Sequence, residues 1–106
     1  MTNTTISQVK ERLDNGEAIH IIDVREANEY AEDNIGATLL PLSELRNFDA
    51  EAIEDFKDQE LIIHCRSGKR SIEACLILEQ MGFTNVVNLE GGILAWREQL
   101  GERNYK

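Results

Sequence analysis

The stretch Leu61-Ile62-Ile63-His64-Cys65-Arg66-Ser67-Gly68-Lys69-Arg70-Ser71 decides how this chain folds around one cysteine. Its apolar half is typical of a buried strand that ends at Cys65, and a short loop with one glycine and three cations leads into a helical pattern. The backbone N–H groups of such a loop converge with the positive end of the following helix on one point. A sulfur at that point lies in a positive field, so the pattern predicts that the Cys65 thiolate is favoured over the thiol.

Helical and strand patterns alternate on both sides of this stretch. The spacing predicts helices over residues 6–13, 27–31, 43–45, 50–56, 71–81 and 93–100, with Ser7 and Ser43 as caps of the first and third. Short apolar runs predict strands over residues 18–22, 38–41, 61–64 and 86–89. This alternation is typical of an α/β fold with a mostly parallel sheet and helices on both faces. In such sheets a ligand binds beyond the carboxyl ends of the strands, where Cys65 falls.

Composition and charge narrow the class of protein. The 106 residues, 42% hydrophobic and 29% charged, predict one domain over residues 1–106 with its core at about residues 6–100. No apolar stretch approaches the roughly 20 residues of a membrane span. The first residues, Met1-Thr2-Asn3-Thr4-Thr5, lack the pattern of a secretion signal, so we expect a cytoplasmic location. A net charge of −9 argues against binding to nucleic acid or anionic membranes.

Two further features are interpreted as structural. Asp49 to Glu60 holds six acids against the single Lys57, which indicates a solvated helix face, with a docking surface for a basic partner as the alternative. Two cysteines do not make a disulfide framework here, and their spacing is not that of a zinc site, so we expect no metal or other cofactor. Cys75 falls on the buried stripe of the helix over residues 71–81 and is predicted to be a core residue rather than a second reactive thiol.

Short motifs along the chain occur in a recognisable order: Asp23-Val24-Arg25-Glu26, Glu29-Tyr30, Ile35-Gly36-Ala37, the loop from Cys65 to Ser71, Leu78 with Met81-Gly82-Phe83, and Leu89-Glu90-Gly91-Gly92-Ile93 with Trp96. Together they resemble a rhodanese domain of the free-standing, single-domain kind, over about residues 6–100. The resemblance implies a rhodanese-like α/β fold with a central sheet of about five strands.

The resemblance also implies sulfur transfer. The matching cysteine of the family, here Cys65, takes a sulfane sulfur from thiosulfate or a persulfide donor. It then passes the sulfur to a thiophilic acceptor, which is cyanide, a thiol or a thioredoxin-like protein. The loop amides can surround the outer sulfur of the persulfide, and cations at the mouth of the site can bind the sulfonate end of the donor. The candidate substrate-binding residues are Arg66, Ser67, Gly68, Lys69, Arg70 and Ser71.

Residues next to the loop are expected to support it. Asp23 and Arg25 end the neighbouring strand, and the resemblance implies that they brace the active-site side of the sheet, as an ion pair rather than as catalytic groups. His64 points to the opposite face from Cys65, so we predict a buried histidine with satisfied polar atoms and not a base. We interpret His20 in the same way.

Three other positions complete the expectations. Trp96 and Tyr30 are predicted packing anchors, and Gly91-Gly92 is predicted to be a turn whose backbone comes close to the cysteine loop. One segment departs from the family, which usually resembles His-Ile-Pro-Gly-Ala where this chain has Asn34-Ile35-Gly36-Ala37. Any role of that histidine therefore cannot be transferred.

Two alternatives remain open. The order of His64, Cys65, a glycine and an arginine is also similar to the loop of cysteine phosphatases and arsenate reductases. Phosphatase loops are one residue longer between cysteine and arginine, however, and the four residues between Cys65 and Arg70 suit a single sulfur better than a phosphate. The other alternative is a non-catalytic rhodanese-like interaction module, which selective alkylation of Cys65 near neutral pH would distinguish.

Overall fold

A parallel sheet of five strands, in the order β1-β5-β4-β2-β3, forms the centre of the computed structural model, which describes residues 1–106. The strands are β1 (Thr2–Thr4), β2 (Ile21–Asp23), β3 (Thr38–Leu39), β4 (Glu60–His64) and β5 (Asn85–Leu89). Every pairing between neighbours is parallel, and β4 lies in the middle of the order. The predicted α/β class with a sheet of about five strands is confirmed.

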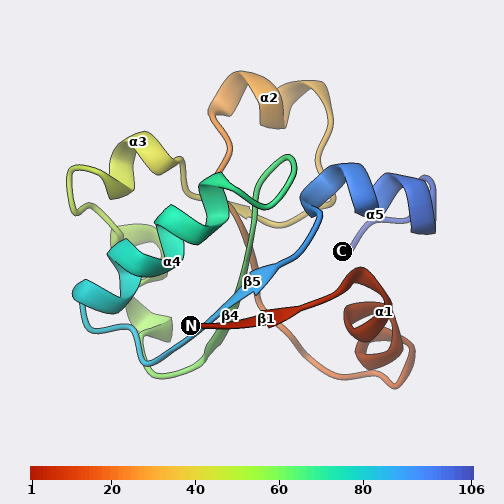
Figure 1. The fold of residues 1–106 in the computed structure, drawn as a ribbon, viewed down its shortest axis with the longest axis horizontal. Helices are drawn as coiled ribbons and strands as arrows, with labels where there is room; N and C mark the ends of the chain where they lie inside the picture. The colour runs from red at the N-terminus through yellow and green to blue at the C-terminus, as the bar shows by residue number, and fades with distance from the viewer.

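Helices cover both faces of this sheet. They are α1 (Ile6–Asp14), α2 (Ala27–Glu32), α3 (Leu42–Leu45), the 3₁₀ helix η1 (Glu51–Phe56), α4 (Arg70–Gln80) and α5 (Gly92–Leu100). Figure 1 shows α3 and α4 on one side of the strands and α1 and α5 on the other, with α2 near the loop that leads into α4. No helix is long and apolar enough to cross a bilayer.

The alternation of side chains along β4 divides the core into two halves. Leu61 and Ile63 pack with residues of α3 and α4, whereas Ile62 packs with residues of α1 and α5. Successive residues of a strand point to opposite faces, so Cys65 continues the first set. The cysteine thus lies under the start of α4, where the loop predicted from the sequence holds it.

Several element boundaries differ from the predictions. Strand β1 was not predicted, because its three residues are polar and only Thr4 is buried; its ladder partner β5 supplies the pairing. Ser7 is not the cap of α1, since Thr5 holds that position in a capping box with Gln8. Ser43 lies inside α3 and donates its hydroxyl to Glu26 instead of capping the helix.

Two predicted segments are present but differ in extent or in helix type. The strand predicted over residues 18–22, ending at Asp23-Val24-Arg25, is paired only at Ile21–Asp23, so residues 18–20 precede the ladder. The helix predicted over residues 50–56 is a 3₁₀ helix with Ile53 buried, and its three acids, Glu51, Glu54 and Asp55, are exposed, as is Asp58 just beyond it. The acidic run is therefore a solvated face, as interpreted from the sequence.

Candidate active site

Cys65 follows β4 directly and opens the loop that leads into α4. The residue is 1% exposed, and the Gly68 amide donates a hydrogen bond to its sulfur at 3.1 Å. The hydroxyl of Ser71, in the first turn of α4, lies 3.5 Å from the same sulfur. Gly68 has a φ of 104°, a backbone conformation that residues with a side chain rarely adopt. This conformation lets the loop turn the Gly68 amide toward the sulfur.

The hydrogen bonds around the sulfur determine its acidity. Burial alone would raise the pKa of Cys65, and it is the largest single effect. The Ser71 hydroxyl and the amides of Ser71, Gly68 and Ser67 together outweigh it, so the pKa of Cys65 lies below its ordinary value. The loop therefore favours a thiolate, as the sequence pattern predicted.

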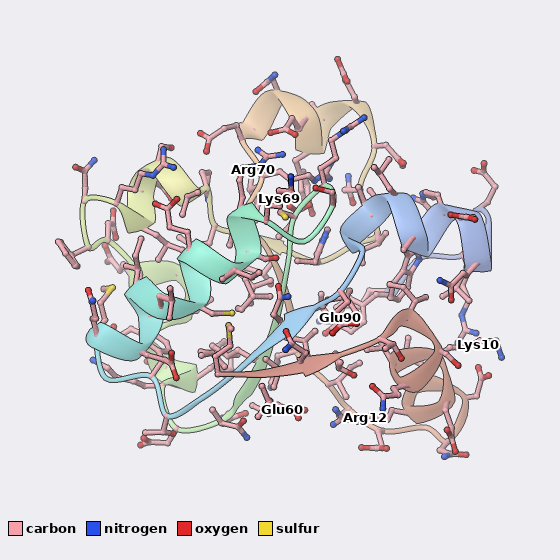
Figure 2. The ribbon with its side chains drawn as sticks, in the orientation of Figure 1. Lys10, Arg12, Glu60, Lys69, Arg70 and Glu90 are labelled. Atoms are coloured by element: carbon pink, nitrogen blue, oxygen red, sulfur yellow. The ribbon has the colours of Figure 1, made fainter.

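The three cations of the loop have different surroundings. Arg66 and Lys69 are exposed and form no salt bridge. Arg70 is half-buried and binds both carboxylate oxygens of Glu29 on α2, at 2.6 and 2.8 Å. Figure 2 shows Lys69 and Arg70 at the end of α4 nearest α2. All three were expected to be partly exposed at the mouth of the site, but only Arg66 and Lys69 are free of a partner.

The start of α5 holds the loop from the other side. The amides of Ile93 and Leu94 donate to the carbonyls of Cys65 and Arg66, at 3.0 and 3.1 Å. A Cβ on Gly92 would lie 2.4 Å from the Cys65 carbonyl oxygen and 2.6 Å from that of Arg66. Only glycine permits this approach, which confirms the predicted contact between the Gly91-Gly92 turn and the cysteine loop.

A buried ion pair braces the neighbouring strand. Asp23 is fully buried and Arg25 is 5% exposed, and the guanidinium binds the carboxylate through Nε at 3.1 Å and Nη2 at 2.8 Å. Arg25 also donates to the Asp33 carbonyl at 2.7 Å, which ties the end of β2 to the residues after α2. The geometry agrees with the bracing role expected for this pair, because neither side chain contacts the sulfur.

His64 faces away from the sulfur, toward Asp23. Its Nδ1 lies 3.1 Å from the Cys65 carbonyl oxygen, and its Nε2 lies 3.4 Å from Asp23 Oδ2 without forming a hydrogen bond. Burial lowers the pKa of His64, against the opposing effect of Asp23. The prediction that His64 is buried is confirmed, but its polar atoms are only half satisfied. The same prediction is wrong for His20, which precedes β2, is only half-buried and bonds Gln59 at 3.0 Å.

Two residues at the site were not identified from the sequence. Asn88 on β5 is 3% exposed, and its Oδ1 lies 2.5 Å from the Ser71 hydroxyl. The available signal was a polar residue inside an apolar strand, next to the Gly91-Gly92 turn. Glu29, which binds Arg70, belongs to the Glu29-Tyr30 motif, but no role was predicted for it, because its partner lies far away in the sequence.

Comparison with known proteins decides the family. A family model described as Rhodanese-like domain matches residues 5–99. The chain belongs to the rhodanese-like domain family. A sulfurtransferase of Allochromatium vinosum is 38% identical over 89 residues, which cover 83% of this chain and 80% of that protein. The thiosulfate sulfurtransferase PspE of Escherichia coli is 37% identical over 75 residues, 70% of this chain and 71% of that protein.

Solved structures agree with this assignment. The crystal structure of a rhodanese-like domain protein from Staphylococcus aureus superimposes on this rhodanese-like domain with a TM-score of 0.77. The two chains are 30% identical, and the match covers 91% of each. The match extends over most of the chain, and the resemblance inferred from the motifs is confirmed.

The segment that departs from the family has its own internal bonds in this rhodanese-like domain. Asn34 stands where the family usually has histidine; its Oδ1 accepts from the Gly36 amide at 2.9 Å and its Nδ2 donates to the Tyr30 carbonyl at 3.1 Å. The Tyr30 hydroxyl donates to the Ala37 carbonyl at 2.7 Å. The shortened turn is thus held by an asparagine and a tyrosine, and Tyr30, predicted to be a packing anchor, is half-buried and acts through its hydroxyl.

Cys75 and Trp96 are core residues, as predicted. Both are fully buried, and burial, followed by the charge of Glu79, raises the pKa of Cys75 to about 12. The Trp96 indole N–H donates to the Arg103 carbonyl at 2.7 Å. This rhodanese-like domain therefore has one cysteine with a lowered pKa and one with a strongly raised pKa.

A pocket of about 180 Å³ opens beside the cysteine loop. Arg66 lines one part of it, and Ile93 and Leu94 from the start of α5 line another. Cys65 is not among the residues that line this pocket.

Proposed function

We propose that this chain is a sulfurtransferase that carries a sulfane sulfur on Cys65. The observation that supports it most directly is the Cys65 sulfur, which receives the Gly68 amide at 3.1 Å and has a lowered pKa. A thiolate of low pKa is both a nucleophile and a leaving group, and transfer in two steps needs both properties. The named sulfurtransferases among the relatives point to the same chemistry.

The proposed first step charges the cysteine. The Cys65 thiolate attacks the outer sulfur of thiosulfate, an S–S bond to the protein forms, and the S–S bond of thiosulfate breaks. Sulfite leaves with the electron pair of that bond. The resulting persulfide carries its negative charge on the outer sulfur, toward which preorganised amides are a favourable environment. The amides that act on Cys65 belong to Ser67, Gly68 and Ser71.

The proposed second step discharges the persulfide. Cyanide, or the thiolate of a small or thioredoxin-like acceptor, attacks the outer sulfur and forms thiocyanate or an acceptor persulfide. The bond between the two sulfurs breaks, and the electron pair returns to Cys65 as the thiolate.

Arg66 and Lys69, the two loop cations without a salt bridge, are available to bind the anionic donor in the first step.

Intact-mass measurement tests the proposal. Thiosulfate should add the mass of one sulfur atom to the protein, and cyanide should remove it. Cys65→Ala should abolish the gain, whereas the matched variant Cys75→Ala should keep it, because the pKa of Cys75 is about 12. A sulfur adduct that survives Cys65→Ala, or no adduct on the wild type with any donor, contradicts the proposal.

A further inference from the structure

A chain of polar side chains leads from the cysteine to the edge of the sheet. The Cys65 sulfur lies 3.5 Å from Ser71 Oγ, which lies 2.5 Å from Asn88 Oδ1. Asn88 Nδ2 in turn donates to Asn3 Oδ1 at 3.2 Å. Ser71 and Asn88 are 0% and 3% exposed, whereas Asn3 on β1 is exposed. Ser71 thus bonds only the sulfur and Asn88 through its side chain, and Asn88 links Ser71 to the exposed Asn3.

The number of protons available between Cys65 and Asn88 limits which of these hydrogen bonds can form at the same time. The Ser71 hydroxyl has one proton to donate. When Cys65 is a thiol, the S–H can point to Ser71, and Ser71 donates to Asn88 Oδ1, which is the arrangement in the structure. When Cys65 is a thiolate, the Ser71 proton is needed at the sulfur, and an oxygen of Asn88 at 2.5 Å would then face the Ser71 oxygen with no proton between them.

An asparagine side chain can remove this conflict by turning. Rotation of the amide by half a turn puts its NH₂ group where the oxygen was, with little change of shape. Asn88 would then donate to Ser71, and Ser71 would donate to the sulfur. The exposed Asn3 can turn with it, because solvent can satisfy either orientation of its amide. No proton crosses Asn88 in this change; the thiol proton leaves to a base in solution.

We propose that Asn88 is a positioning residue for Cys65, whose amide turns with the charge of the sulfur and directs the Ser71 proton toward the thiolate and the persulfide. The inference rests on the proposed role of Cys65 as the nucleophile. It extends the machinery from the cysteine loop to strand β5 and names a residue that never contacts the transferred sulfur.

Other ionisable groups around the sulfur must be separated from this effect. They are His64 at the end of β4, Asp23 at the end of β2 and Arg25 after it, Glu29 on α2, Arg66 and Lys69 in the loop, Arg70 and Cys75 on α4, and Glu90 before α5. None of them forms a hydrogen bond with Asn88, whose side-chain partners are Ser71 and Asn3. Substitution of Asn88 therefore changes the chain of hydrogen bonds and leaves these charges in place.

The first test measures the rate of Cys65 alkylation by iodoacetamide against pH in the Cys75→Ala protein. Asn88→Leu should raise the pH midpoint of alkylation by about 0.5–1 pKa unit. The thiolate form loses the support of Asn88 for the charge-assisted hydrogen bond from Ser71 to the sulfur, whereas the thiol form loses only a neutral hydrogen bond. Ser71→Ala should raise it at least as much, and the double variant should equal Ser71→Ala alone. Asn85→Leu, at the exposed start of the same strand, is the matched control and should leave the midpoint unchanged.

The second test needs no substitution at Asn88. In ¹⁵N-labelled protein, the side-chain amide signals of Asn88 should shift with the same midpoint as Cys65 alkylation and again on conversion to the persulfide. Ser71→Ala should abolish most of that shift. An additive double variant, an unchanged midpoint in Asn88→Leu, or an amide shift that persists fully in Ser71→Ala would overturn the inference. The alkylation midpoint and the pH titration of the Asn88 amide need no sulfur donor, so failure of sulfur transfer alone would reject the proposed function and not this inference.

Discussion

Arg70, the first residue of α4, and Glu29 on α2 form a bidentate ion pair with contacts of 2.6 and 2.8 Å. The pair joins the end of the cysteine loop to a helix that precedes it by a long stretch of chain. Much of the positive charge of Arg70 is therefore neutralised by the Glu29 carboxylate. Arg66 and Lys69 remain the loop cations without a salt bridge.

Arg66→Ala should impair the use of thiosulfate without unfolding the protein. Loss of a charge-assisted contact to the donor costs about 1.5–3 kcal/mol, or roughly ten- to a hundredfold in kcat/KM. The exposed side chain contributes little to stability, so the Tm should stay constant. Steady-state kinetics with thiosulfate and a thermal melt measure both quantities. Lys10→Ala, which removes an exposed cation on α1 (Figure 2), is the control. Equal kinetics for both variants would contradict a donor-binding role for Arg66.

Glu29→Gln should lower stability in a pH-dependent way. Arg70 is the main cause that lowers the pKa of Glu29 to about 2, from an ordinary value of 4.5 in the unfolded chain. The pair therefore stabilises the fold fully above pH 4.5, and this contribution is lost as the pH falls toward 2. At neutral pH we expect a loss of about 1 kcal/mol, since both side chains are partly solvated.

Urea unfolding at neutral pH and near pH 3 measures this difference. The gap between wild type and Glu29→Gln should narrow at the lower pH. Glu32→Gln, on the same helix and without a salt bridge, should show no such gap at either pH. A gap that is independent of pH would mean that the carboxylate charge of Glu29 does not stabilise the fold.

Gly92→Ala should distort the cysteine loop. Its Cβ would lie 2.4 Å from the Cys65 carbonyl oxygen, so the first turn of α5 must move away and lose its amide contacts with the loop. Gly101→Ala is the matched control, because Gly101 has a similar φ, 60° against 55°, and no atom within 4 Å of the added Cβ. Both variants should lose about 1 kcal/mol for the backbone conformation.

Only Gly92→Ala should also slow sulfur transfer, by roughly a hundredfold, since misplacement of preorganised groups by about 1 Å has effects of that size. Persulfide formation followed by mass spectrometry, beside a thermal melt, separates the two effects. Equal transfer rates in both glycine variants would show that the contact between α5 and the loop has no effect on the chemistry.

Loop length should set the choice between sulfur and phosphate. Four residues separate Cys65 from Arg70, and the unmodified protein should transfer sulfur while hydrolysing aryl phosphates negligibly. One glycine inserted between Gly68 and Lys69 should weaken sulfur transfer, because the amides no longer converge on the sulfur. A phosphatase assay and a thiosulfate assay on both proteins measure this. Robust phosphate hydrolysis by the wild type without sulfur transfer would contradict the proposed function and favour a cysteine phosphatase.

Much of this protein could be predicted from local sequence. The apolar run before Cys65, the helical spacing after Ser71 and the Gly91-Gly92 turn each depend on residues within a few positions of one another, and each is present in the structure. Local periodicity determines which side of a strand or helix is buried. The alternation that places Cys65 and His64 on opposite faces of the sheet follows from the same rule.

The rest depends on which segments the sheet brings together. Strand β1 has no apolar pattern and exists because β5 offers a free edge to pair with. Glu29 meets Arg70, and Asn88 meets Ser71, across 41 and 17 residues of sequence. A polar side chain carries no local sign of its partner, because its hydrogen bonds are set by strand order and helix placement. The sequence by itself therefore determined the loop that places Cys65 between a strand and a helix, whereas only the tertiary structure decided which residues hold that loop and which side chains lie next to the sulfur.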